Sequence, residues 1–373
     1  MLTQALPGHI HRFTFDMRAA MLTLACLALA ACAPSETDPQ PTRQTVEEER
    51  PVPAELSFDQ RVLEDRLEAI GDAFEGEVGI AVVEVSSEAE MHYRGHEFMP
   101  QQSVSKLWVS LTALDQADAG ELDLSEPVLI RPEDLTVFHQ PVRDIVLRDG
   151  YARSTLDDLI EQALTRSDNT ANDKILRRVG GPQAVEAMLA DKGLTDIRFG
   201  RDERTKQSAI AGLEWRQAYS IGPAFFDARD KVDDRVRRQA FETYLADPED
   251  GASALGIAHA LAKLARGQLM SRAVSDRLLE TLSETRSGPN RLKGAVPPAW
   301  EISHKTGTGQ YFDGEQSGYN DVGLLTAPDG SRYAVAVMIG RTRVGIPASM
   351  AMMHEVVNAV VAYHEAVAPE ADS

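Results

Sequence analysis

The stretch Ser103-Val104-Ser105-Lys106 is the first of three short motifs that decide how this chain folds; the others are Ser167-Asp168-Asn169 and Lys305-Thr306-Gly307. Each motif supplies a different part of one reaction, acyl transfer through a serine nucleophile. A single Ser-x-x-Lys occurs by chance in many chains, and Lys-Thr-Gly is an ordinary turn tripeptide. The three motifs in this order, spread over a chain of globular size, predict that they meet in one catalytic site.

The first motif is predicted to open a helix. Apolar residues recur at helical spacing, at Val104, Leu107, Trp108, Leu111 and Leu114. Ser103 and Lys106 then share one face, and a lysine whose pKa is lowered by burial or a nearby cation can take the proton of a serine hydroxyl. The backbone N–H of Ser103 would also face a developing oxyanion. The alternative is an N-cap serine with a solvated lysine one turn on.

The other two motifs are predicted to lie at the ends of regular elements. Ser167-Asp168-Asn169 falls between two helices, where a hydroxyl and an amide can relay a proton and bind a carbonyl; helix capping is the alternative. Lys305-Thr306-Gly307-Thr308-Gly309 follows a strand predicted to begin at Trp300. It offers a cation, a hydroxyl and glycines that let a substrate approach the backbone, although a plain strand end with a Gly turn would look the same.

Composition excludes several kinds of function. The 373 residues carry a formal charge of −20, which argues against a nucleic-acid surface and indicates a solvated exterior. The nine histidines are scattered without a metal-ligand pattern, and no phosphate-binding glycine loop is present, so neither a metal nor another cofactor is expected. With 43% apolar residues, the chain is long enough for two lobes around a shared core, and no hydrophobic oligomer surface is evident, so a monomer is expected.

The N-terminus is predicted to be a targeting segment, residues 1–32. Arg18 precedes an apolar run that is too short to span a bilayer as a mature helix. The run ends in Leu29-Ala30-Ala31-Cys32, which resembles a bacterial lipobox and predicts export with a lipid anchor at Cys32 on the periplasmic side. A plain secretory signal with an incidental Cys32 is the alternative. Residues 33–55, rich in Pro, Glu, Thr and Gln, are predicted to form a flexible tether.

The folded part is predicted to span residues 56–373 as an α+β domain. A helix is expected from Leu56 and another from Pro347, and strands are expected at 78–85, 92–98, 300–305, 322–325 and 333–339. The stretch between about 103 and 290 is helical in character. This order predicts one antiparallel sheet built from both termini, with an all-helical lobe inserted between its strands.

The three motifs resemble those of the class A β-lactamases and penicillin-binding proteins. The resemblance to class A β-lactamases covers about Leu56 to Ala366 and is strongest in Ser167-Asp168-Asn169-Thr170-Ala171-Asn172 and in Lys305-Thr306-Gly307-Thr308-Gly309. It implies a β-lactamase/transpeptidase-like fold and a small β-lactam substrate. It also implies hydrolysis of that substrate in two steps through an acyl-enzyme.

The resemblance implies a role for each motif residue. Ser103 would attack the lactam carbonyl, with the backbone N–H groups of Ser103 and Thr308 as the oxyanion hole. Lys106 would take the serine proton, either itself or with Glu203 through a water. Ser167 would pass a proton to the departing nitrogen. The remaining positions would hold substrate: the carboxylate on Lys305, Thr306 and Gly307, and the side-chain amide on Asn169.

A fourth element distinguishes lactamases from peptidases, a glutamate that activates the deacylating water. Counting on from the second motif places it at Glu203, in Glu203-Arg204-Thr205-Lys206-Gln207, where the family usually has Glu-x-x-Leu-Asn. Gln207 would replace the amide that orients the water, while Lys206 stands in place of a leucine. The alternative is an exposed glutamate in a charged loop.

Two further departures separate this chain from the family pattern. An insertion of about thirty residues, within 208–250, carries enough aromatic residues to pack as an added subdomain or to cover the cleft. The arginine that often follows Lys-Thr-Gly on the next strand is absent, and Arg341 or Arg343 is the expected substitute. Two rival functions remain open: a D-Ala-D-Ala peptidase or esterase on the same scaffold, and a non-hydrolytic lipoprotein that binds peptidoglycan or β-lactams.

Overall fold

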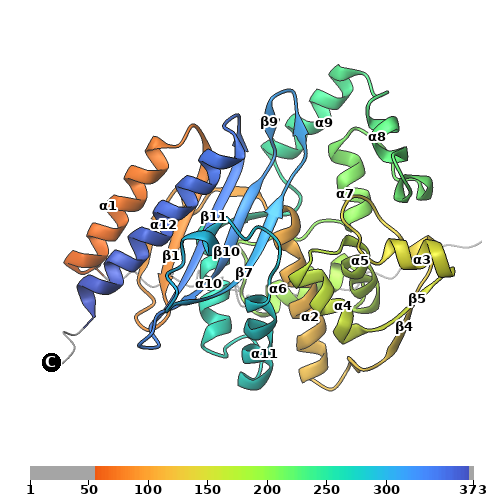
Figure 1. Ribbon diagram of the computed structural model, residues 1–373. Helices are drawn as coiled ribbons and strands as arrows, with labels where there is room; N and C mark the ends of the chain where they lie inside the picture. The colour runs from red at the N-terminus through yellow and green to blue at the C-terminus, as the bar shows by residue number, and fades with distance from the viewer. Residues whose placement is uncertain (1–54, 369–373) are drawn as a thin grey trace, which may run out of the picture. The chain divides into compact units, whose positions relative to one another are not determined.

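The computed structural model describes residues 55–368, which form a sheet covered by helices and joined to a helical half (Figure 1). The sheet is antiparallel, in the order β2-β1-β11-β10-β7. Its strands are β1 Gly76–Glu84, β2 Glu90–Tyr93, β7 Glu301–Thr308, β10 Tyr319–Thr326 and β11 Arg332–Thr342. A small hairpin, β8 Tyr311–Phe312 and β9 Glu315–Gln316, extends the sheet at β11. The expected sheet from both termini is confirmed.

Helices cover both faces of this sheet. α1 (Phe58–Ala73) and α12 (Ile346–Val367) lie side by side on one face, and α10 (Ala254–Ala265) packs against β1, β10 and β11 (Figure 1). The strand side chains alternate between the two cores, since Ile80 packs with the α1 and α12 side and Ala81 with the α10 side. A β-branched and alanine-rich run therefore forms a strand that is buried on both faces.

The helical half is arranged around α2 (Lys106–Asp118), which packs against α4, α5, α6 and α11. The bounds of these partners are α4 Leu156–Thr165, α5 Asn169–Arg178, α6 Pro182–Asp191 and α11 Arg272–Ser283. A further helix, α3 (Arg143–Asp149), precedes α4. Trp108 is fully buried at the centre. The expected helical stretch 103–290 also contains a small sheet of β4 Pro127–Ile130 and β5 Ala152–Thr155. It also supplies β6 Gly251–Ser253, which pairs with β3 Phe98–Pro100 just before the stretch.

The insertion folds as a helical layer that begins in α7 (Glu203–Ile210) and continues through α8 (Ala224–Arg229) and α9 (Asp234–Ala246). Phe225 packs edge-on against Phe138, with ring centroids 5.0 Å apart. Arg238 of α9 pairs with Glu315 of β9 at 2.9 Å, which ties the layer to the edge of the sheet (Figure 1). The aromatic residues of the insertion thus pack against one another and against Phe138 of the helical half.

Three local expectations need correction. Lys305-Thr306-Gly307 does not follow a strand but forms the end of β7, because β10 pairs with it as far as Thr308. Ser103 lies in a 3-10 turn, Gln102–Ser105, directly before α2. Glu203 is not in a loop but is the first residue of α7, where Asp202 caps the helix by accepting from the Thr205 N–H.

The predictions for the N-terminus concern residues outside the described part of the chain. These are the targeting segment 1–32 with Cys32, and the tether 33–55 apart from Glu55. Within residues 55–368, no helix is long and apolar enough to cross a membrane.

Candidate active site

The nucleophile candidate sits on a strained turn. Gln102, directly before Ser103, has a positive φ of 56°, which a non-glycine residue adopts only when its surroundings hold it there. Its backbone N–H donates to Asp250 Oδ2 at 3.0 Å, and its side chain donates to Ser317 O and to the Tyr244 hydroxyl. These buried partners hold Ser103 just before the N-terminus of α2, where it lines the cleft.

Lys106 joins the nucleophile to the glutamate. Its Nζ donates to Ser103 Oγ at 2.8 Å and to Glu203 Oε1 at 2.9 Å, and its side chain is fully buried. Burial lowers the pKa of Lys106, and the nearby Glu203 carboxylate only partly offsets this effect. The lowered pKa makes the neutral amine, which is the form that a base requires, easier to reach. The alternative of a solvated lysine is wrong.

Glu203 is held by its own helix and by α5. Its backbone N–H donates to Asp173 Oδ1 at 3.0 Å, and its Oε2 accepts from Gln207 Nε2 at 3.3 Å. The residue is 4% exposed, so an exposed glutamate in a charged loop is excluded. Burial raises the pKa of Glu203, but the ammonium groups of Lys106 and Lys206 outweigh burial and lower it to about 2. The carboxylate is therefore ionised and available as a base.

The second motif connects α4 to α5. Asp168 is the helix cap, accepting from the N–H groups of Thr170 and Ala171, so the capping interpretation holds for this residue. Ser167, with a positive φ of 58°, presents its Oγ to Lys305 Nζ at 3.2 Å. Asn169 lines the cleft while its Nδ2 donates to Val137 O at 2.8 Å. Within this one motif, Asp168 therefore caps the helix, while Ser167 and Asn169 line the cleft.

The third motif forms the opposite wall of the cleft. Gly307 must be glycine, because a Cβ there would lie 2.3 Å from Gln101 O, beside the nucleophile turn. Thr306 Oγ1 shares a hydrogen bond with Ser287 Oγ at 2.7 Å. Lys305 is buried, and burial together with the cations Lys106 and Arg291 holds the pKa of Lys305 well below its usual range.

A cleft of about 600 Å³ lies between these elements, within the range of small-molecule sites. Seven predicted site residues line it: Ser103, Ser167, Asn169, Glu203, Gln207, Thr306 and Thr308. Lys106 and Lys305 reach it through hydrogen bonds to Ser103 and Ser167. No residue of 208–250 is among the residues that line the cleft, although Phe225 of the insertion contacts the lining residue Phe138. Within residues 55–368, no group of three or more His, Cys, Asp or Glu side chains is arranged to hold a metal.

The structure adds one cation that the sequence interpretation missed. Arg291 lines the cleft from the segment before β7, with Nη1 donating to Gly307 O at 2.8 Å and to Asn320 O at 2.6 Å. The expected substitutes are wrong, because Arg341 and Arg343 both pair with Glu315 of β9 and neither lines the cleft. No motif marks Arg291 in the sequence; only its approach to β7 in the fold places it in the site.

The fold and the site are those of a serine hydrolase, in which a buried lysine is hydrogen-bonded both to a serine hydroxyl and to a buried glutamate. The chain belongs to the β-lactamase enzyme family, whose model matches residues 61–364. The expected resemblance is thus confirmed, and the chain is a serine hydrolase of the class A β-lactamase type.

Individual relatives agree with this assignment. The extended-spectrum β-lactamase PER-1 of Pseudomonas aeruginosa is 28% identical over 76% of this chain and 82% of its own length. The β-lactamase Toho-1 of Escherichia coli is 25% identical over 69% of this chain and 76% of its own length. Among solved structures, an ancestral class A β-lactamase superposes with a TM-score of 0.65 at 26% identity, covering 80% of this chain and 99% of that one. The expected α+β fold is confirmed.

Proposed function

We propose that the chain hydrolyses β-lactam antibiotics through an acyl-enzyme on Ser103, which is released by a water that Glu203 activates. The observation that carries this proposal is the position of Lys106, whose Nζ is shared between Ser103 Oγ at 2.8 Å and Glu203 Oε1 at 2.9 Å. A glutamate joined to the nucleophile through one lysine is suited to hydrolysing the ester that the serine forms.

In acylation, Lys106 takes the proton of Ser103 as the hydroxyl attacks the lactam carbonyl. The direct hydrogen bond and the lowered pKa of Lys106 support this assignment over a route through Glu203. The carbonyl oxygen becomes an oxyanion that the backbone N–H groups of Ser103 and Thr308 stabilise. The C–N bond then breaks, and Ser167, hydrogen-bonded to Lys305, passes a proton to the departing nitrogen. Ser167 regains a proton from the ammonium group that Lys106 has become, so the proton that left Ser103 is accounted for on the nitrogen.

In deacylation, the ionised Glu203 takes a proton from water while the water oxygen attacks the ester carbonyl. Gln207 donates to Glu203 Oε2 and lines the cleft, so it is placed to orient that water. The ester bond to Ser103 breaks, and the serine oxygen recovers its proton. The product is the ring-opened acid.

Substrate is held by the walls of the cleft. Lys305, Thr306 and Gly307 bind the substrate carboxylate, together with Arg291, which lines the same wall. On the other side, Asn169 binds the amide of the acyl side chain. Its Nδ2 already donates to Val137 O, which leaves the side-chain oxygen to accept from the substrate N–H.

The test is turnover of a chromogenic cephalosporin by the purified full chain and by the variants Ser103→Ala and Glu203→Gln. We expect sustained turnover for the parent, none for Ser103→Ala, and one burst followed by a trapped acyl-enzyme for Glu203→Gln, detected as a mass increase. Glu355→Gln, which changes a surface glutamate of α12 paired with Arg66, is the matched control and should turn over as the parent does.

The rival functions predict other results. A D-Ala-D-Ala peptidase or esterase would give one burst from the parent itself, with no added effect of Glu203→Gln. A non-hydrolytic lipoprotein would bind the cephalosporin without opening its ring. Either result would refute the proposal.

We also propose that the protein is exported and anchored by a lipid at Cys32, facing the periplasm, and acts as a monomer. The lipobox-like Leu29-Ala30-Ala31-Cys32 supports the anchor. Labelling of expressing bacteria with a fatty-acid analogue tests it, since Cys32→Ala should abolish the label and release the protein from the membrane fraction. Label that persists in Cys32→Ala would show that the lipid is attached elsewhere.

A further inference from the structure

Lys206 is a buried cation at a place where the family pattern has a leucine. Its side chain is 1% exposed, and its Nζ lies 3.0 Å from Asp250 Oδ2, 3.4 Å from Glu203 Oε1 and 3.5 Å from Ser105 Oγ. A buried ammonium is costly unless it is paired, and Lys206 is paired on both sides. The carboxylate of Glu203 therefore meets two ammonium groups on the same oxygen, those of Lys106 and Lys206.

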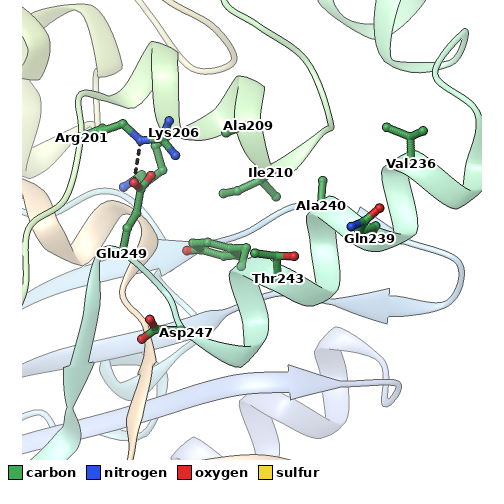
Figure 2. Close-up of a pocket in the computed structure, with 11 residues that line it drawn as sticks. Arg201, Lys206, Ala209, Ile210, Val236, Gln239, Ala240, Thr243, Asp247 and Glu249 are labelled. Atoms are coloured by element: carbon green, nitrogen blue, oxygen red, sulfur yellow. Dashed lines mark hydrogen bonds and ion pairs between the residues drawn. The ribbon is translucent and has the colours of Figure 1, made fainter.

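Asp250 holds Lys206 in this position through the ion pair that it forms with the same ammonium group. Its Oδ2 also accepts from the N–H of Gln102, the strained residue before the nucleophile, and its Oδ1 accepts from the Tyr244 hydroxyl at 2.8 Å. Lys206 and Tyr244 also line a cavity of about 370 Å³ between α7 and α9, and Figure 2 shows Lys206 beside the Arg201–Glu249 pair. The insertion, through Tyr244, thus supports the aspartate that anchors Lys206.

We propose that Lys206 is a positioning residue that acts through Glu203: its ammonium group, anchored by Asp250, keeps the deacylating carboxylate ionised in acidic solution. This inference rests on the proposed role of Glu203 as the deacylation base. An opposite charge within about 4 to 6 Å lowers the pKa of a carboxyl by about 1 to 3 units, and Lys206 lies at 3.4 Å. Lys206 itself stays charged, because Asp250 and Glu203 outweigh the lowering of its pKa by burial.

Lys206 also favours the neutral form of Lys106. When Lys106 is neutral, Lys206 remains as the counter-charge of Glu203, so the site does not need a proton on Lys106 to balance the carboxylate. Burial lowers the pKa of Lys106, and the charge of Lys206 lowers it further. One cation therefore serves both steps, by keeping Glu203 ionised and by leaving Lys106 free to accept the serine proton.

Other charges also face Glu203 and remain in place when Lys206 is replaced. Along the chain these are its neighbours Asp202 and Arg204. From the surrounding elements, Lys106, Asp173, Tyr244 and Lys305 interact with Glu203 itself, while Glu249 and Asp250 interact with Lys206. A difference between the parent and a Lys206 variant therefore reports the charge of Lys206.

The experiment measures the deacylation rate of the full chain from pH 3.5 to pH 8, using acyl-enzyme formed with a slowly released cephalosporin. In the parent, whose Glu203 has a pKa of about 2, the rate should stay level down to pH 3.5. In Lys206→Met we expect the acid limb to move up by about two to three pH units and so to enter the measured range. Lys206→Arg, which keeps the charge, should restore the parent limb. Lys263→Met is the matched control, because that lysine contacts only the carbonyls of Lys192 and Gly193 at the end of α6.

A second variant covers the case in which Lys206→Met does not fold, since it leaves Asp250 unpaired in the core. Lys206→Met combined with Asp250→Asn removes both charges and should still move the limb upward, but by less than Lys206→Met alone, because the lost Asp250 charge opposed that of Lys206. Met variants with the parent's acid limb would overturn the inference, as would an equal movement in Lys263→Met. If those variants titrate like the parent while Glu203→Gln still traps the acyl-enzyme, only the inference on Lys206 fails. If Glu203→Gln turns over normally, the proposed function fails first.

Discussion

Arg291 is predicted to be the principal anchor of a substrate carboxylate, and Arg291→Leu is the perturbation that tests it. The guanidinium is 6% exposed and packs over the ring of Tyr319, 3.7 Å from its centroid. Nη1 is occupied by two backbone carbonyls, Nη2 donates to Thr308 Oγ1, and Nε has no hydrogen-bond partner among the described residues. Because Nε is itself buried, the group that Arg291 offers at the cleft wall is a rigid cation and not a free Nε donor.

The magnitude follows from the kind of bond that is lost. A hydrogen bond to a charged group contributes about 1.5 to 3 kcal/mol, which corresponds to a change of about 10- to 150-fold in binding. Because the carboxylate is held in the ground state and in the transition state alike, KM should rise by this factor while kcat changes little. Arg291→Lys should recover only part of the loss, since an ammonium lacks the planar fork.

The assay is steady-state hydrolysis of a penicillin and of its methyl ester, which lacks the negative charge. The parent should prefer the free acid, and Arg291→Leu should lose that preference while its KM for the ester stays the same. Arg343→Leu, at the far edge of the sheet, is the control arginine. Thermal unfolding of each variant shows whether the loss of two carbonyl partners has destabilised the fold. A folded Arg291→Leu variant with the parent's KM for the free acid would refute the reasoning.

Two further predictions concern stability. Trp108→Ala should lower the free energy of unfolding by about 3 to 5 kcal/mol, because it empties the centre of the helical half, whereas Phe58→Ala, 71% exposed, should change it by less than about 0.5 kcal/mol in the same urea titration. Equal losses in the two variants would contradict this. Burial, with Asp202 and Glu203, raises the pKa of Asp173 to about 6, so the folded protein binds that proton more tightly than the unfolded chain and loses stability as the pH rises through 6. Asp173→Asn should therefore gain stability relative to the parent between pH 4 and pH 7, by up to about 3 kcal/mol, and a difference that is the same at both pH values would rule this out.

Local pattern predicted the elements of the fold well. The run Val78–Val85 alternates between two apolar cores, and Leu156–Leu164 presents one apolar face, so each element appears in the sequence at its own period. The strand that contains Lys305 was predicted too short. Its last residues are polar and glycine-rich, and only the pairing of β10 extends the strand to Thr308.

The sequence predicted those residues of the site that belong to the three motifs. Ser103, Ser167 and Lys305 stand in short patterns whose spacing is visible along the chain, and the fold brings them to one cleft. Glu203 was found only by counting from the second motif, and its burial could not be predicted, because a charged heptapeptide looks solvated in sequence. Its environment comes from α2, α5 and the segment before β6, which are distant along the chain.

The amino-acid sequence by itself therefore determined the class of fold, the order of its elements and the residues of the three motifs, because periodicity and local spacing are properties of neighbours along the chain. The tertiary structure alone decided which charges meet. Arg291 rather than Arg341 or Arg343 faces the cleft, and Lys206 is buried between Glu203 and Asp250. Electrostatic partners are set by distances of a few ångströms between segments that are tens of residues apart, and no local pattern records those distances.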